Sequence, residues 1–171
     1  QRLVTPVGAF SVRTEAWVET SDTIAVQPGA PLTAVQFLPD WILEYLLPSR
    51  YCQSDQFYDL ACQIGLNVTP GYDQVEAIRA WIQHHIEYRY GTSNASTSAL
   101  DTAQQRVGVC RDFTHLGIAL CRALSIPARM VVGYLYQLEP MDLHAWIEAY
   151  INNRWYTFDA TQAQPCGNRI A

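Results

Sequence analysis

A cysteine stands at the start of an apolar stretch in GVCRDFTHLGIALCRALSIPAR, the segment from residue 108 to 129. The residues from Phe113 to Leu124 leave almost no polar face, which predicts a buried helix over about 110–124 that ends before the Ile-Pro step at 126–127. Cys110 would then lie in the first turn of that helix. Free N–H groups at a helix start carry partial positive charge, which favours the thiolate and lowers the thiol pKa. Cys110 is therefore predicted to be a nucleophile.

A thiol nucleophile needs a base, and the base needs a group that orients it. The segment LHAWIEAYINNRWYTFDAT predicts two antiparallel strands joined by a turn at Asn152 and Asn153. With a two-residue loop, Asp159 lies opposite Trp146, diagonal to His144 and on the same face of the sheet. A four-residue loop keeps this arrangement, whereas a three-residue loop moves Asp159 to the other face unless a bulge corrects it. The spacing predicts that Asp159 can orient His144 and that the helix presents its cysteine to the same face.

The residues alone leave a second interpretation open, in which the cysteine is buried and the strand histidine bonds core carbonyl groups. Cys121 lies three turns along the same helix and is expected in the core, and His115 falls on a different face from the thiol. The remaining candidates are assigned to packing or to the surface: Cys52, Cys62, Cys166, His84 and His85. A metal site formed by Cys110, His115, Cys121 and His144 would have no recognised ligand spacing, so no metal is expected.

The patterns around these segments predict an α+β fold. Alternation in FSVRTEAWVET, residues 10–20, predicts a strand, so residues 1–31 are expected to be a β segment and residues 32–171 the core domain. A helical period begins near residue 38, and a stronger one over 71–86 predicts an amphipathic helix. The Ser- and Thr-rich segment 91–103 is expected to be mostly loop, and ARMVVGYLYQL a strand. Helices thus come first, and an antiparallel sheet packs against the central helix.

Composition excludes several classes of protein. Of the 171 residues, 49% are hydrophobic and 16% charged, which indicates a folded domain with a sizeable core. A formal net charge of −5 argues against nucleic acid or an anionic membrane as a partner, and no apolar run is long enough to span a membrane. Five irregularly spaced cysteines favour a reducing, cytoplasmic location. The chain begins within a β region and ends soon after the last predicted strand, so we expect it to be truncated at both ends.

Three blocks of the sequence resemble the transglutaminase-like superfamily, in its bacterial branch of papain-like cysteine enzymes. TAQQRVGVCRDFTHLGIALCRALSIPARMVVGYL is similar to the nucleophile helix and following strand of that family. DLHAWIEAYINNRWYTFDAT is similar to its His-Ala-Trp block and the strand that carries its aspartate, and YLLPSRYC with IRAWIQHHIEYRYG to the preceding helices. The likeness covers residues 38–163 and implies a papain-like core, with the β segment before it resembling the end of an attached N-terminal region.

The resemblance also implies roles for the candidate residues. Cys110 would be the nucleophile, His144 the general base and acid, and Asp159 the group that orients the histidine. The thiolate would attack an amide or peptide carbonyl, and the thioester would pass to water or to an amine. The oxyanion would be met by the backbone N–H of Cys110 and by a second donor, for which the Gln104 amide is a candidate, although a surface glutamine is the alternative.

These inferences predict a cysteine hydrolase that acts on a peptide or protein amide without a cofactor. Hydrolysis is preferred because no second-substrate channel or calcium loop is evident. Two alternatives remain open. The first is a protein transamidase that joins a glutaminyl group to an amine, and the second is a non-catalytic interaction domain that kept the fold.

Overall fold

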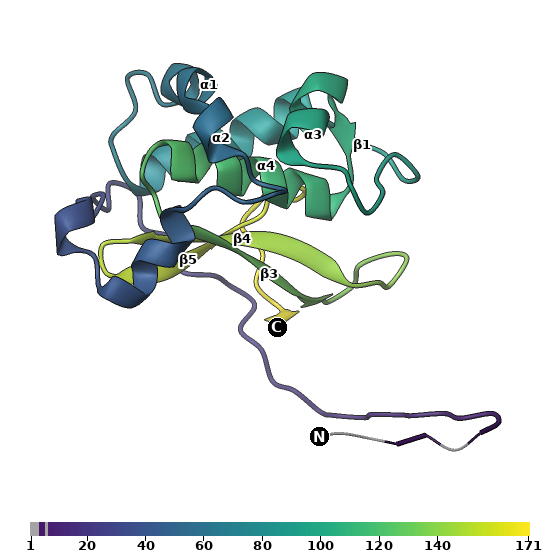
Figure 1. Cartoon of the computed structure of the whole chain (residues 1–171). Helices are drawn as coiled ribbons and strands as arrows, with labels where there is room; N and C mark the ends of the chain where they lie inside the picture. The colour runs from purple at the N-terminus through teal and green to yellow at the C-terminus, as the bar shows by residue number, and fades with distance from the viewer. Residues whose placement is uncertain (1–3, 6) are drawn as a thin grey trace.

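The computed structural model describes residues 4, 5 and 7–171 (Figure 1). Its α-helices are α1 (Tyr58–Ile64), α2 (Tyr72–His85), α3 (Ala99–Gln105) and α4 (Cys110–Ala123). Its strands are β1 (Glu87–Tyr88), β2 (Val107–Gly108), β3 (Ala128–Leu135), β4 (His144–Ile151), β5 (Arg154–Phe158) and β6 (Arg169–Ile170). Three short 3-10 helices precede α1: η1 (Val35–Phe37), η2 (Asp40–Leu46) and η3 (Ser54–Gln56).

Helix α4 lies between the other helices and a four-stranded antiparallel sheet of order β5-β4-β3-β6 (Figure 1). Every residue of α4 from Asp112 to Cys121 is buried, as its unbroken apolar pattern predicts. Helix and sheet approach most closely at Gly117, where an added Cβ would lie 2.2 Å from the Ile147 Cδ1 atom. The α+β fold with a central buried helix on an antiparallel sheet is therefore confirmed.

The hairpin that carries two of the candidate site residues forms with the predicted register. Strand β4 pairs with β5 so that Ile147 faces Phe158 and Ile151 faces Arg154. The two-residue turn holds Asn152 and Asn153 at φ values of 46° and 63°. Asparagine tolerates this left-handed conformation, which the favoured two-residue hairpin turns require. Asp159, the next residue after β5, is thereby brought level with the start of β4.

The predicted strand over residues 10–20 is wrong. Within the described part of the chain, this segment is extended but pairs with no other strand, and in Figure 1 it runs away from the body of the molecule. Its apolar side chains are exposed, including Phe10, Val12 and Trp17. A period of two favours a strand only where a neighbouring strand supplies hydrogen bonds and a face to cover. Residues 1–3 and 6 of the predicted β segment lie outside the described residues.

Two other segments differ from their sequence patterns. The helical period after residue 38 forms the short 3-10 helix η2, which buries Ile42 against Tyr150 on the sheet face opposite α4. The segment predicted to be mostly loop contains the start of α3. Ser98 caps this helix: its hydroxyl accepts from the Asp101 N–H at 3.5 Å, and the Asp101 carboxylate accepts from the Ser98 N–H at 2.8 Å. This reciprocal pair is a capping box, a signal present in the sequence.

Candidate active site

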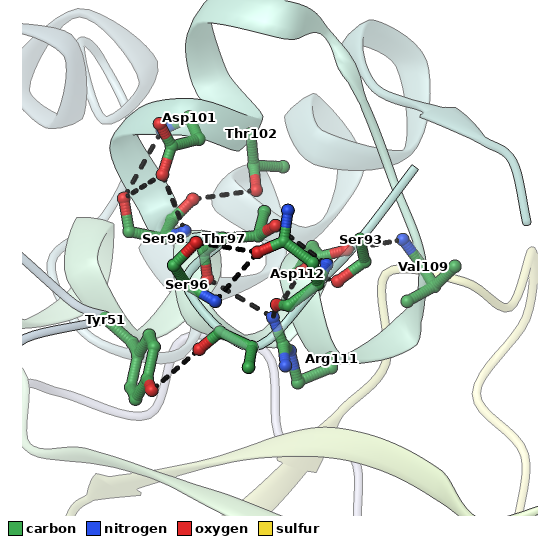
Figure 2. Close-up of polar contacts among 12 residues, drawn as sticks. Tyr51, Ser93, Ser96, Thr97, Ser98, Asp101, Thr102, Val109, Arg111 and Asp112 are labelled. Carbon is green, nitrogen blue, oxygen red and sulfur yellow. Dashed lines mark hydrogen bonds and ion pairs between the residues drawn. The ribbon is translucent and has the colours of Figure 1, made fainter. Parts of the chain in front are cut away.

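Asp112 fixes the start of the helix that carries Cys110. Its carboxylate is fully buried, and one oxygen accepts from the Val109 N–H at 2.9 Å while the other accepts from the Ser93 hydroxyl at 2.8 Å (Figure 2). Gly108 allows this close approach, because a Cβ at that position would lie 2.7 Å from the Asp112 Cβ. An acidic side chain in the first turn also complements the positive end of the helix. Helix α4 therefore begins at Cys110, with its free N–H groups beside the thiol.

The loop before α3 is tied to the same helix start. The Arg111 guanidinium donates to the backbone carbonyl groups of Asn94 and Thr97, and the Tyr51 hydroxyl donates to the Ala95 carbonyl at 2.9 Å (Figure 2). Arg111 also forms an ion pair with the Asp112 carboxylate, 3.4 Å away. These contacts fix the loop against the first turn of α4.

The fold brings the three predicted site residues together. The Nε2 atom of His144 lies 2.7 Å from Oδ2 of Asp159, and both side chains are buried. The Cys110 thiol, which is half-buried, lies beside the imidazole of His144. Because Nε2 faces the carboxylate, Nδ1 is the nitrogen left for the sulfur. The diagonal placement of Asp159 and His144 expected from the hairpin is the one observed.

The electrostatics of this series favour an ion pair between sulfur and imidazole. Burial alone would raise the pKa of the Cys110 thiol, but hydrogen bonds from His144 and from the Ala145 and Arg111 backbone outweigh it, so that pKa is lowered. Burial would lower the pKa of His144, whereas its bonds to Asp159 and Cys110 raise it to about 9. The thiolate and the imidazolium therefore coexist between the lowered pKa of the thiol and about pH 9.

The carboxylate of Asp159 is held at both oxygens. Oδ1 accepts from the Thr161 N–H at 2.9 Å and from the Thr161 hydroxyl at 2.7 Å. Oδ2, which binds His144, also accepts from Nη1 of Arg169 at 2.8 Å. Burial would raise the pKa of Asp159, but His144, Arg169 and Thr161 lower it to about 2. Sequence reasoning missed Arg169, because nothing local marks a residue of the last, two-residue strand as a neighbour of this site.

Gln104 and Tyr88 bear on the second oxyanion donor. Gln104 is exposed near the end of α3 and makes no side-chain hydrogen bond within the described residues, so its role stays a prediction without support from a contact.

Tyr88 ends β1, which pairs with β2 directly before α4 and sets Tyr88 level with Gly108. Burial raises the pKa of the Tyr88 hydroxyl, the charge of Cys110 raises it further, and a hydrogen bond from the Cys110 backbone opposes both. The phenol therefore stays protonated beside the backbone N–H of the nucleophile.

A groove opens beside the imidazole, with a volume of about 280 Å³. It is lined by Tyr88, Tyr90, Leu138, Glu139, His144, Thr161 and Gln162. Tyr88 and Tyr90 make part of this lining aromatic, and Leu138 and Glu139 come from the segment between β3 and β4. His144 and Tyr88 thus border the same groove.

The other predicted candidates lie elsewhere. His115 stacks on Tyr51 with ring centroids 5.1 Å apart, and burial with the charge of Arg111 lowers its pKa to about 4. Cys121 is fully buried, and burial raises its pKa to about 12, which makes it a core residue without nucleophilic character. His84 and His85 are exposed on α2. Neither His115 nor Cys121 joins the site that contains Cys110.

Residues 4, 5 and 7–171 contain no group of three or more His, Cys, Asp or Glu side chains placed to hold a metal ion. Within the same residues, no helix has the length and apolar character needed to cross a bilayer.

Comparison with known proteins identifies the family. Residues 58–160, which include the Cys110, His144 and Asp159 series, match the Transglutaminase-like superfamily. The chain belongs to this superfamily. An uncharacterised protein from Mycobacterium leprae is 30% identical over 177 residues, which cover 92% of this chain and 63% of the relative.

Solved structures of similar chains share the transglutaminase-like fold. A candidate cysteine protease from Cytophaga hutchinsonii is 49% identical with a TM-score of 0.77, covering 83% of this chain and 50% of that one. The periplasmic domain of TgpA from Pseudomonas aeruginosa is 21% identical with a TM-score of 0.58, covering 73% of this chain and 48% of that one, and shows the fold alone. The chain thus spans about half to two thirds of the length of these relatives.

Proposed function

We propose that this transglutaminase-like chain is a cysteine-dependent acyl-transfer enzyme that hydrolyses an amide or peptide bond. The observation that carries the proposal is the placement of the His144 imidazole, whose Nε2 atom lies 2.7 Å from the Asp159 carboxylate and whose ring lies beside the Cys110 thiol. A thiol with a lowered pKa beside an imidazole with a raised pKa is the arrangement that makes a cysteine nucleophilic near neutral pH. Membership of the family and the similarity to a candidate cysteine protease support the same kind of chemistry.

The first half of the reaction forms a thioester. The Cys110 thiolate attacks the carbonyl carbon, a C–S bond forms, and the carbonyl electrons move onto oxygen. The His144 imidazolium then gives its proton to the departing amine as the C–N bond breaks. Asp159 holds the ring so that Nδ1 faces the sulfur throughout.

The second half releases the acid. Neutral His144 takes a proton from water, hydroxide attacks the thioester carbonyl, and the C–S bond breaks to restore the thiolate. In both halves, the oxyanion is met by the Cys110 backbone N–H and, we propose, by the Tyr88 hydroxyl. Hydrogen-bond donors placed where this charge develops supply much of the rate enhancement in acyl transfer.

Alkylation of the thiol tests the proposal without a known substrate. The folded protein is treated with iodoacetamide between pH 5 and pH 10, and the labelled cysteine is identified by peptide mapping. Cys110 should react well below the pKa of a free thiol, and His144→Ala should remove that reactivity, while Cys121 stays unlabelled in both. If Cys110 behaves as an ordinary thiol and His144→Ala changes nothing, the non-catalytic alternative is favoured.

A second experiment separates hydrolysis from transamidation. A glutamine-containing protein such as casein is incubated with the chain and a labelled primary amine, and peptide cleavage, ammonia release and amine incorporation are followed together. We expect cleavage or ammonia release to exceed incorporation, with Cys110→Ser abolishing all three. Faster incorporation of the amine would establish the transamidase alternative instead.

A further inference from the structure

Arg169 reaches the site from outside the segment that matches the family. The match ends at residue 160, whereas Arg169 lies on β6, which pairs with β3 near the end of the chain. The side chains of Arg169 and Asp159 are both more than nine-tenths buried, and Nη1 of Arg169 lies 2.8 Å from Oδ2 of Asp159. A buried cation that binds the carboxylate of the proposed site changes the charge that His144 experiences.

One oxygen of the Asp159 carboxylate binds two positively charged side chains. His144 Nε2 lies 2.7 Å from Oδ2 of Asp159, and Arg169 Nη1 lies 2.8 Å from that same atom. The two nitrogens are therefore separated by less than the sum of those distances, close enough for the guanidinium to disfavour a second positive charge on the imidazole. Oδ1 is occupied separately by Thr161, so the orientation of the carboxylate does not depend on Arg169 alone.

Two more contacts hold the guanidinium in place. Its Nε donates to the Cys166 carbonyl at 2.8 Å, and its plane lies over the Trp146 ring at 5.1 Å from the centroid. Trp146 in turn stacks on the His144 ring, with centroids 6.2 Å apart. Arg169 is thus fixed against the same aromatic side chain that packs on the proposed base.

We propose that Arg169 is a positioning residue that acts through Asp159: by sharing Oδ2 with His144, it limits how tightly the imidazole holds its proton. This inference rests on the proposed function. An unshared aspartate would hold the imidazolium more strongly, which makes the imidazole a weaker acid toward a departing amine. The guanidinium therefore tunes the proton transfer without touching the substrate.

Other ionisable groups border the pair, among them Tyr72 and Cys166 beside Asp159 and Arg169, and Tyr90 beside His144. Cys110 is the partner of His144, and Tyr88 and Glu139 lie on the groove side. Glu76 and Arg79 of α2 border the small cavity next to Asp159 and Arg169, and Glu148 lines a second cavity together with Arg169. Glu76 and Arg79 pair with each other at 2.7 Å, and Glu148 pairs with Arg129 at 2.7 Å. Arg169 is the cation that shares an oxygen with His144.

The test is the pH dependence of Cys110 alkylation by iodoacetamide. The wild-type rate should rise to a plateau as the ion pair forms, then rise again near pH 9 as His144 loses its proton. Arg169→Gln and Arg169→Met should move this upper step upward by about one pH unit, because a positive neighbour within a few ångströms shifts a pKa by at least that much. Arg169→Lys, which keeps a charge, should leave the step close to its wild-type position.

Arg129→Gln is the matched control. Arg129 also binds a carboxylate of β4, Glu148, and lies over an aromatic ring, Trp155, at 4.1 Å, but it is not bonded to Asp159. The Arg129→Gln variant should have a lower thermal stability, and its upper step should stay at the wild-type pH. The inference is overturned if the upper step stays at the same pH, or moves to a lower pH, in Arg169→Gln and Arg169→Met. It is also overturned if neither of these two variants folds while Arg129→Gln does.

Failure of the inference can be told apart from failure of the proposed function. If the wild-type protein shows a single step near the pKa of a free thiol, no ion pair exists and the proposed function is lost. If the wild type shows two steps and the Arg169 variants do not shift the upper one, only the role of Arg169 is lost.

Discussion

At the scale of single residues, the chemistry depends on how neighbours set three protonation states. Burial opposes charge on Cys110, His144 and Asp159, and in each case hydrogen bonds and opposite charge outweigh it. The negative carboxylate supports the imidazolium, and the imidazolium supports the thiolate. Each charge therefore depends on the next, so that removing one group should change the behaviour of the other two.

Replacement of Asp159 by Asn tests this dependence. Loss of the carboxylate charge should lower the pKa of His144 from about 9, so the ion pair should disappear at a lower pH on its alkaline side. The upper limit of any hydrolytic pH profile should fall accordingly, and the neutral-pH rate should drop by at least about 10²-fold. An unchanged alkaline limit measured by pH–rate analysis would contradict the assignment of Asp159.

Tyr88→Phe tests the proposed second oxyanion donor. Because the hydroxyl would stabilise only the oxyanion, its loss should lower the hydrolytic rate by about 10²-fold and leave alkylation of Cys110 nearly unchanged. Tyr90→Phe, which alters the neighbouring ring at 5.5 Å, should have a much smaller effect on the rate. Equal losses in the two variants would assign Tyr88 to packing of the groove instead.

At the scale of elements, the nucleophile depends on how one helix begins. Asp112 binds the Val109 N–H and the Ser93 hydroxyl, and Gly108 leaves room for its carboxylate. Because a capping side chain satisfies backbone groups that a helix leaves free, its loss frays the first turn. That turn contains Cys110 and its backbone N–H. The position of the cap therefore links helix stability to reactivity of the thiol.

Asp112→Ala should cost about 2–3 kcal/mol of unfolding free energy, since it removes a cap and leaves buried partners unsatisfied. It should also slow alkylation of Cys110 at neutral pH. Asp101→Ala removes the equivalent capping carboxylate from α3 and should cost about 1 kcal/mol without slowing the alkylation. Urea unfolding and alkylation kinetics on both variants make the comparison, and a slower thiol in Asp101→Ala would count against the link.

At the scale of the whole molecule, residues 21–22 bind the backbone just before Arg169, which itself binds Asp159. The Gly167 N–H donates to the Asp22 carbonyl at 3.1 Å, and the Asn168 N–H donates to the Ser21 carbonyl. Arg169 follows directly in β6. The segment near residue 22 thus stabilises β6, the strand whose Arg169 side chain binds Asp159 of the candidate site.

Gly167→Ala tests this arrangement. An added Cβ would lie 2.3 Å from the Ser21 carbonyl oxygen and 2.3 Å from the Asp22 carbonyl carbon, so one of the two segments must move. We expect a loss of about 1–3 kcal/mol in unfolding free energy by urea denaturation. Trp17→Ser, at a fully exposed position of the same N-terminal segment, should stay within about 0.5 kcal/mol of wild type. If Trp17→Ser lowered the unfolding free energy as much as Gly167→Ala, the stabilising contacts of the N-terminal segment would not be confined to residues 21 and 22.

Local sequence patterns determined the central helix, the register of the β4–β5 hairpin and the relation of His144 to Asp159, because periods of 3.6 and two residues fix which side chains share a face. Tertiary structure alone decided that residues 10–20 form no strand, that Tyr88 stands beside Cys110, and that Arg169 shares the Asp159 carboxylate. Strand pairing and buried charges depend on segments that are far apart in the chain. A local sequence period does not indicate which distant segment will pack against it.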